Sequence, residues 1–93
     1  MASNFQLFAH RNNDSLYLQL YGDFDGNSAH QLIDTLIQKG RDVSNVFIDT
    51  NDLSRVYSFG INVFEKKARS LKKHSNLVFI GKNKTAFVIE YMY

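Results

Sequence analysis

The stretch that decides the fold is residues 45–64, which read NVFIDTNDLSRVYSFGINVF. Residues 45–49 are apolar and rich in β-branched and aromatic side chains, which predicts a short strand. A polar connection follows, and then Ser58 and Gly60 precede the apolar repeat of a helix. The sequence therefore predicts a strand, a turn and a helix, with Ser58 at a helix N-terminus, where unpaired backbone amides favour an anion.

Two amphipathic helices are predicted from apolar residues that recur at steps of three and four. The first is followed by Gly40, which stands where a left-handed C-terminal cap is expected. The second is predicted over residues 59–73. The stripe of the first helix consists of Ala29, Leu32, Ile33, Leu36 and Ile37, and that of the second consists of Ile61, Phe64, Ala68 and Leu71.

Three further strands are predicted by alternation or by short apolar runs. Residues 5–10 and 16–21 alternate and flank the turn-forming residues 11–15, which predicts an antiparallel hairpin. Residues 22–28 read as a loop that supplies helix N-caps. Residues 76–81 predict a parallel strand buried on both faces. The fold class is therefore α/β, with a small mixed sheet made of an N-terminal hairpin followed by parallel strands.

Length and composition narrow the class of protein. With 93 residues, a hydrophobic fraction of 44% and a charged fraction of 22%, the chain is expected to form one folded domain over residues 1–93. A net charge of +2 is too small to direct it to DNA or to an anionic membrane. It has no cysteine, no signal-like N-terminus and no long apolar run, so we expect a cytoplasmic location.

Candidates for catalysis and metal binding are few. His10, His30 and His74 lie far apart without metal-ligand spacing, and we expect no metal and no cofactor. Asp23 and Asp25 lie two residues apart and could form an acid/base pair, but aspartates in loops usually stabilise turns. We therefore expect no catalytic residue and no enzyme activity.

Basic residues concentrate near the end of the second predicted helix, at Lys66, Lys67, Arg69, Lys72, Lys73 and His74. Their ordinary interpretation is a solvated helix face whose last-turn cations complement the helix dipole. Interleaved aromatic residues and a wider basic surface, which nucleic-acid binding requires, are missing. Nucleic acid is therefore not an expected partner.

Ser58 is the residue with two interpretations. A serine before a helix is most often an N-cap, which contributes about 1 kcal/mol. The same position would accept a phosphate, because a phosphoserine there would face free amides and add nearly two negative charges to the surface. A protein partner that contacts this surface would then be repelled.

These features together resemble the STAS family, the sulfate-transporter and anti-sigma-factor-antagonist domain, over about residues 5 to 85. The resemblance rests on the order of elements, on the loop containing Gly22, Phe24 and Asp25, and on Ser58 followed by Gly60. It implies helices packed mainly on one face of the sheet, as in SpoIIAA. It also implies a non-catalytic partner switch, in which a serine kinase that acts as an anti-sigma factor phosphorylates Ser58.

The sequence departs from the family's motif. Tyr57 replaces the acidic residue before the serine, and Phe59 replaces the second serine or threonine. The chain ends at Tyr93, before the C-terminal helix of longer members would be complete. Phe87, Tyr91 and Tyr93 are therefore expected to cover the core or to contact a partner.

Three functions remain open at this point. The first is the phosphorylation-controlled anti-sigma factor antagonist, and the second is a constitutive STAS subunit that binds the ATPase of a bacterial lipid-transport ABC complex. The second is suggested by residues 53–56, which are similar to the segment before the motif in those subunits. The third is a nucleotide- or anion-binding module. The resemblance implies a phosphorylation site at Ser58 and a partner-binding set of Asp25, Tyr57, Ser58, Phe59, Gly60 and Asn62.

Overall fold

A computed structural model of the chain describes residues 4–71 and 76–88. The elements follow one another as β1 (Gln6–Asn12), β2 (Ser15–Phe24), α1 (Gly26–Lys39), β3 (Asn45–Val56), α2 (Ser58–Ser70), β4 (Asn76–Ile80) and α3 (Thr85–Val88). The strands form one sheet in the order β1-β2-β3-β4. β1 pairs with β2 antiparallel, and the β2/β3 and β3/β4 pairs are parallel. The predicted mixed sheet is therefore confirmed.

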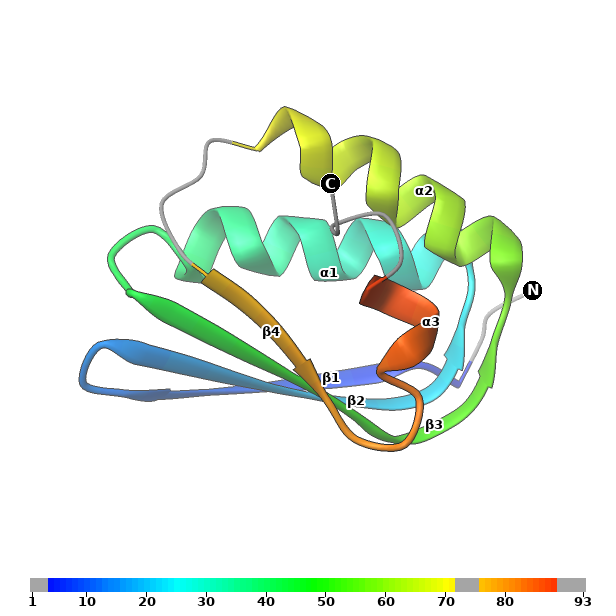
Figure 1. The fold of residues 1–93 in the computed structure, drawn as a ribbon, viewed down its shortest axis with the longest axis horizontal. Helices are drawn as coiled ribbons and strands as arrows, with labels where there is room; N and C mark the ends of the chain where they lie inside the picture. Colours follow the sequence, from blue (N-terminus) through cyan, green and yellow to red (C-terminus); the bar gives the residue numbers. More distant parts are fainter. Residues whose placement is uncertain (1–3, 72–75, 89–93) are drawn as a thin grey trace.

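The helices lie on one face of this sheet, with α2 packed on α1 and both helices beginning at the same end of the molecule (Figure 1). This layering follows from the alternation in β2, where Leu16, Leu18 and Leu20 are buried beneath the helices. The helix-facing core also includes Ala29, Leu32, Ile33 and Leu36 of α1 and Ile61, Phe64 and Ala68 of α2.

Phe87 of α3 completes the core, as the sequence predicted for that residue. Its ring lies 4.9 Å from the ring centroids of both Phe24 and Phe79 and 6.2 Å from that of Phe64. It is fully buried. One turn of helix after β4 therefore supplies the aromatic group that joins β2, α2 and β4. Tyr91 and Tyr93, which were predicted to act in the same way, lie outside the described residues.

β3 is much longer than the predicted strand of residues 45–49. It continues to Val56, and residues 22–24, predicted as a loop, pair with its second half. The register shifts twice, between Gln19 and Tyr21 and again between Gly22 and Asp23, and each shift places an extra residue in β3. Such bulges break the alternation of buried and exposed side chains, so the polar residues of this half gave no strand pattern.

The prediction that residues 76–81 form a strand buried on both faces was wrong. β4 is an edge strand in which only Phe79 is buried, and β1, the other edge, is exposed along most of its length. Ile37, placed on the buried stripe of α1, is 48% exposed. The helices lie on one face of the sheet, so β4 cannot be buried on both faces.

Both predicted helix ends also need correction. Gly40 caps α1 and its N–H donates to the Leu36 carbonyl, but its φ is −94°, outside the left-handed region. α2 ends at Ser70, three residues before the predicted end at Lys73, which lies outside the described residues. Within the part that the structure describes, no helix is long and apolar enough to cross a membrane.

A buried polar contact joins the middle of β3 to the turn after β4. The hydroxyl of Thr50, which is fully buried, donates to the Ile80 carbonyl at 2.8 Å and accepts from the Asn83 N–H at 3.2 Å. The Asn83 side-chain amide in turn donates to the Thr50 carbonyl at 2.8 Å. These bonds fix the turn that delivers Phe87 to the core.

We predict that Thr50→Val lowers the free energy of unfolding by about 2 kcal/mol, because the partly buried Ile80 carbonyl and Asn83 N–H would lose the hydroxyl with which they pair. Urea unfolding monitored by circular dichroism measures this change. Thr35→Val is the matched control, since the Thr35 hydroxyl only donates to the Gln31 carbonyl within α1. Equal losses in the two variants would contradict the role given to Thr50.

Candidate functional site

The candidate site lies where two strands pass into helices side by side. In the parallel pair of β2 and β3, Phe24 is the register partner of Val56. Each strand is followed by one connecting residue, Asp25 or Tyr57, and then by a helix. The Tyr57 N–H donates to the Phe24 carbonyl at 3.0 Å, which extends the pairing up to the helix. The N-termini of α1 and α2 therefore meet at one end of the sheet (Figure 1).

Asp25 is the N-cap of α1. Its Oδ1 accepts from the Ser28 N–H at 3.0 Å and lies 3.0 Å from the Ser28 hydroxyl. The same hydroxyl, which is fully buried, donates to the Asp23 carbonyl at 2.7 Å. The backbone hydrogen bond from Ser28 is the largest cause that lowers the pKa of Asp25 below its usual value, against partial desolvation. Asp25 therefore carries a negative charge at neutral pH.

α2 begins without such a cap. Its N-cap is Tyr57, whose side chain makes no capping hydrogen bond, and no acidic residue stands in the first turn. The prediction that Ser58 is the N-cap was wrong. Because β3 runs to Val56, the helix begins one residue earlier, and the Ile61 N–H already bonds to the Tyr57 carbonyl at 3.1 Å. Ser58 is instead the first residue of the helix, and it is exposed.

Gly60 allows the two junctions to touch. It is buried, and a Cβ atom at this position would lie 2.8 Å from the carbonyl oxygens of both Phe24 and Asp25. On the other side of the contact, a Cβ on Gly26 would lie 2.9 Å from Cε2 of Phe59. The ring of Phe59 therefore rests on α1, and the backbone of α2 rests on the connection that precedes α1.

The structure brings together some of the predicted site residues and separates others. Asp25, Phe59 and Gly60 lie at the contact between the junctions. On the α2 side, the exposed residues are Tyr57, Ser58 and Asn62, and Tyr57 is 42% exposed. Phe59 is 69% exposed although its ring contacts α1. Within the described residues, no hydrogen bond joins Ser58 or Asn62 to Asp25.

Sequence reasoning missed the contributions of Gly26 and Ser28. Part of the signal was available, because an aspartate directly before a helix accepts from a backbone N–H in the first turn, which here is that of Ser28. Gly26 carried no such signal, since its role depends on the ring of Phe59 more than thirty positions away.

The other candidates take no part in this site. His10 and His30 are exposed, and His74 lies outside the described residues, as do Lys72 and Lys73 of the basic concentration. Among the residues that the structure describes, no group of three His, Cys, Asp or Glu side chains could hold a metal ion. The backbone of Asp23 is engaged at the start of α1, where its carbonyl accepts from Ser28.

Comparison with known proteins places the fold. No family model matches the chain, and no curated protein matches its sequence. An anti-sigma factor antagonist from Mycobacterium paratuberculosis matches in structure with a TM-score of 0.68 and 13% identity, over 95% of this chain and 77% of that one. SpoIIAA in its unphosphorylated form gives a TM-score of 0.61 and 16% identity, over 95% of this chain and 81% of that one.

Two more matches bear on the interpretation. The phosphorylated form of SpoIIAA, a Bacillus cell fate determinant, gives a TM-score of 0.55 and 20% identity, over 94% of this chain and 81% of that one. The protein called Mglu gives a TM-score of 0.67 and 19% identity over 77% of this chain, but the match spans only 18% of Mglu. The chain therefore has the SpoIIAA-like fold of anti-sigma factor antagonists, as the resemblance to the STAS family implied.

The lowered pKa of Asp25 predicts a pH dependence. Because the folded-state pKa lies below the unfolded one, the carboxylate stabilises the fold above the ordinary pKa of 3.8, and this stabilisation is lost as pH falls through the folded-state value. We predict that the difference in unfolding free energy between wild type and Asp25→Asn is largest near neutral pH and shrinks below pH 3.8. Urea unfolding over a pH series measures it.

Asp34→Asn is the control, because it removes an exposed carboxylate from the same helix. Its change in unfolding free energy at each pH is subtracted from that of Asp25→Asn. An Asp25→Asn difference that stayed constant down to the lowest pH would contradict the role of the ionised carboxylate at the start of α1.

Proposed function

We propose that this chain is a non-catalytic regulatory protein that binds a serine kinase or anti-sigma-type protein in the cytoplasm and releases it when Ser58 is phosphorylated. The proposed binding surface, here called the α2 start, consists of Asp25, Tyr57, Ser58, Phe59, Gly60 and Asn62. The fold shared with anti-sigma factor antagonists supports this function, and one of them, SpoIIAA, is known in both phosphorylated and unphosphorylated forms.

The observation that carries the proposal is the residue at the N-cap of α2. Tyr57 occupies a position where serine, threonine, aspartate or asparagine would add about 1 kcal/mol of stability, yet its side chain makes no capping bond and is 42% exposed. Departures from a local rule without a structural gain are typical of functional positions. An exposed aromatic ring on a rigid helix start suits a contact with another protein.

The geometry at Ser58 supports a switch by phosphorylation. Ser58 is exposed in the first turn of α2, and the N–H groups of Ser58 and Phe59 have no acceptor within the described residues. A phosphate there would be stabilised by these amides and by the helix dipole. The fold would therefore tolerate the modification, while a partner seated on Tyr57 and Phe59 would meet about two new negative charges.

A second candidate function is favoured by Phe59. Its ring is 69% exposed and stands where the family's motif has a small hydroxyl residue. A large apolar ring beside Ser58 suits a permanent contact better than a kinase substrate site. The alternative is therefore a constitutive accessory subunit that binds the ATPase of a bacterial lipid-transport ABC complex through the same surface.

Ser58→Asp separates the two functions. In a capture experiment from the lysate of the native host, we predict that wild type retains a kinase-like or anti-sigma-like protein and that Ser58→Asp loses it, because the added charge repels the partner. The substitution should raise the free energy of unfolding by roughly 0.3–1 kcal/mol, since an acidic residue in the first turn complements the helix dipole. Lost binding could therefore not be ascribed to unfolding.

Ser44→Asp is the matched control, because it adds the same charge at an exposed position before β3, at the opposite end of the sheet. Retention of a transport ATPase by wild type and by Ser58→Asp alike would favour the constitutive subunit. Loss of the partner from Ser44→Asp as well would show that binding responds to net charge and would overturn the assignment of the α2 start.

Tyr57→Ser tests the aromatic contact without changing the charge. We predict that it raises the free energy of unfolding by about 1 kcal/mol, because serine can cap α2, and weakens partner binding about tenfold or more, because a central aromatic anchor is lost. Chemical unfolding and titration calorimetry with the captured partner measure the two effects. Phe8→Ser, at a 54% exposed ring on β1, should leave partner binding unchanged. An increase in stability without any loss of affinity would contradict a binding role for Tyr57.

A further inference from the structure

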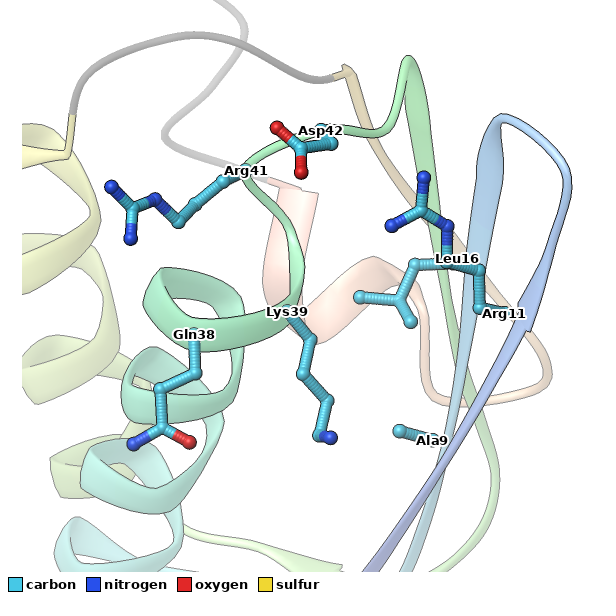
Figure 2. Close-up of a pocket in the computed structure, with 7 residues that line it drawn as sticks. All are labelled: Ala9, Arg11, Leu16, Gln38, Lys39, Arg41 and Asp42. Carbon is cyan, nitrogen blue, oxygen red and sulfur yellow. The ribbon is translucent and has the colours of Figure 1, made fainter.

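A second polar region lies at the other end of α1, at the closed end of the hairpin formed by β1 and β2. Figure 2 shows a hollow there between the end of α1, the loop before β3 and the inner side of the hairpin. Its volume is about 650 Å³. The lining residues are Ala9, Arg11, Leu16, Gln38, Lys39, Arg41 and Asp42.

The hollow exists because the helices leave the end of β1 uncovered. Ala9 and Arg11 pair with Leu18 and Leu16, so they share the sheet face that carries the helices. Both leucines are buried, whereas Ala9 and Arg11 are exposed. α1 ends at Lys39, and the short side chain of Ala9 does not fill the remaining space.

Three cationic side chains from separate segments line this hollow. Arg11 belongs to β1, Lys39 to the last turn of α1, and Arg41 to the loop that follows, while Asp42 is the one acidic lining residue. Within the described part of the chain, no ion pair neutralises the three cations. A concave surface lined by charges of one sign concentrates the potential and attracts ions of the opposite sign.

The hairpin orients the guanidinium of Arg11. Arg11 Nε donates to the carbonyl oxygen of Asn13 at 3.2 Å, and Asn13 itself has a φ of +57° in the turn. This bond uses one of the five donors of the side chain and leaves the terminal NH₂ groups for a ligand. In Figure 2 the guanidinium of Arg11 points toward the loop that carries Asp42, Lys39 points the other way, toward Ala9, and Arg41 points away from both. Arg11 and Lys39 therefore line two ends of the hollow, and a ligand that contacts both must span it.

We propose that this hollow binds the diphosphate group of a small phosphorylated ligand. An arginine at one end of the hollow and a lysine at the other suit an extended, multiply charged phosphate group better than a single carboxylate. The volume lies within the roughly 300–1,000 Å³ of small-molecule pockets, so it leaves room for the remainder of a ligand beyond the phosphates. This site is separate from the α2 start, because the two lie at opposite ends of α1.

The experiment is a titration of the ¹⁵N-labelled full chain with inorganic pyrophosphate at low ionic strength, followed by NMR of the backbone amides. We expect saturable shifts centred on residues 9–16 and 38–42, with a Kd of about 1 mM or lower. A parallel titration with ADP distinguishes the source of the diphosphate. Tighter binding of ADP would indicate a nucleotide ligand, and equal binding would indicate that the phosphates alone are recognised.

Four variants test whether the hollow itself is responsible. Arg11→Gln and Lys39→Gln should each raise the Kd for pyrophosphate about tenfold, because each removes one charge-assisted contact. Ala9→Leu should weaken binding by filling the hollow without changing the charge. Lys67→Gln, which removes an exposed cation from α2, is the matched control and should leave the Kd unchanged.

Three results would overturn the proposal. They are an absence of saturation by about 10 mM pyrophosphate, an equal loss of affinity in Lys67→Gln, and shifts centred on the α2 start. Binding of a glutamate-rich peptide at the hollow without binding of pyrophosphate would likewise assign it to a protein segment. Because Ser58→Asp leaves the hollow intact, none of these results bears on the proposed partner switch.

Discussion

The arrangement of the candidate site depends on one close contact, between the backbone of α2 at Gly60 and the carbonyl groups at the end of β2. A side chain at Gly60 would bring its first carbon to 2.8 Å from two carbonyl oxygens, so only glycine lets the helix approach this closely. The register of β2 and β3, which aligns Phe24 with Val56, places the contact there. The two helix N-termini are consequently adjacent, and Tyr57, Ser58 and Phe59, which precede Gly60, are turned outward.

The two adjacent helix starts are built in different ways. At the start of α1, Asp25 accepts a hydrogen bond from the Ser28 N–H, and the buried Ser28 hydroxyl donates to the Asp23 carbonyl. At the start of α2, the Tyr57 side chain makes no capping hydrogen bond, so the first backbone N–H groups can bond to solvent or to a ligand. If both helix starts were optimised for stability, position 57 would also carry a polar capping residue such as serine or aspartate. This difference in construction supports the proposal that a partner binds at the α2 start, where Asp25 adds a negative charge.

The elements that the sequence predicted correctly are those in which apolar residues recur at a regular spacing without interruption. Leu16, Leu18 and Leu20 alternate without a bulge, and the stripe of α1 repeats through three turns, so both were readable. The second half of β3 was missed because two bulges shift its register against β2. The candidate site was predicted from the residue types around Ser58 and stays a prediction. Its helix cap was misplaced by one residue, because the unrecognised second half of β3 moved the true helix start to Ser58.

The basic hollow could not have been predicted from the sequence, for a different reason. Arg11 and Lys39 are separated by 28 positions, and neither belongs to a run of charges or to a motif. They line the same hollow because α1 ends near the closed end of the hairpin. The same helix thus connects two polar regions of opposite character, a negative charge at Asp25 where it begins and a group of cations where it ends. Because a helix of 14 residues is about 21 Å long, which is at least twice the screening length of about 8–10 Å in physiological salt, the two regions are electrostatically independent. A ligand held at one end would influence a partner at the other only through a change in the packing of α1 against α2.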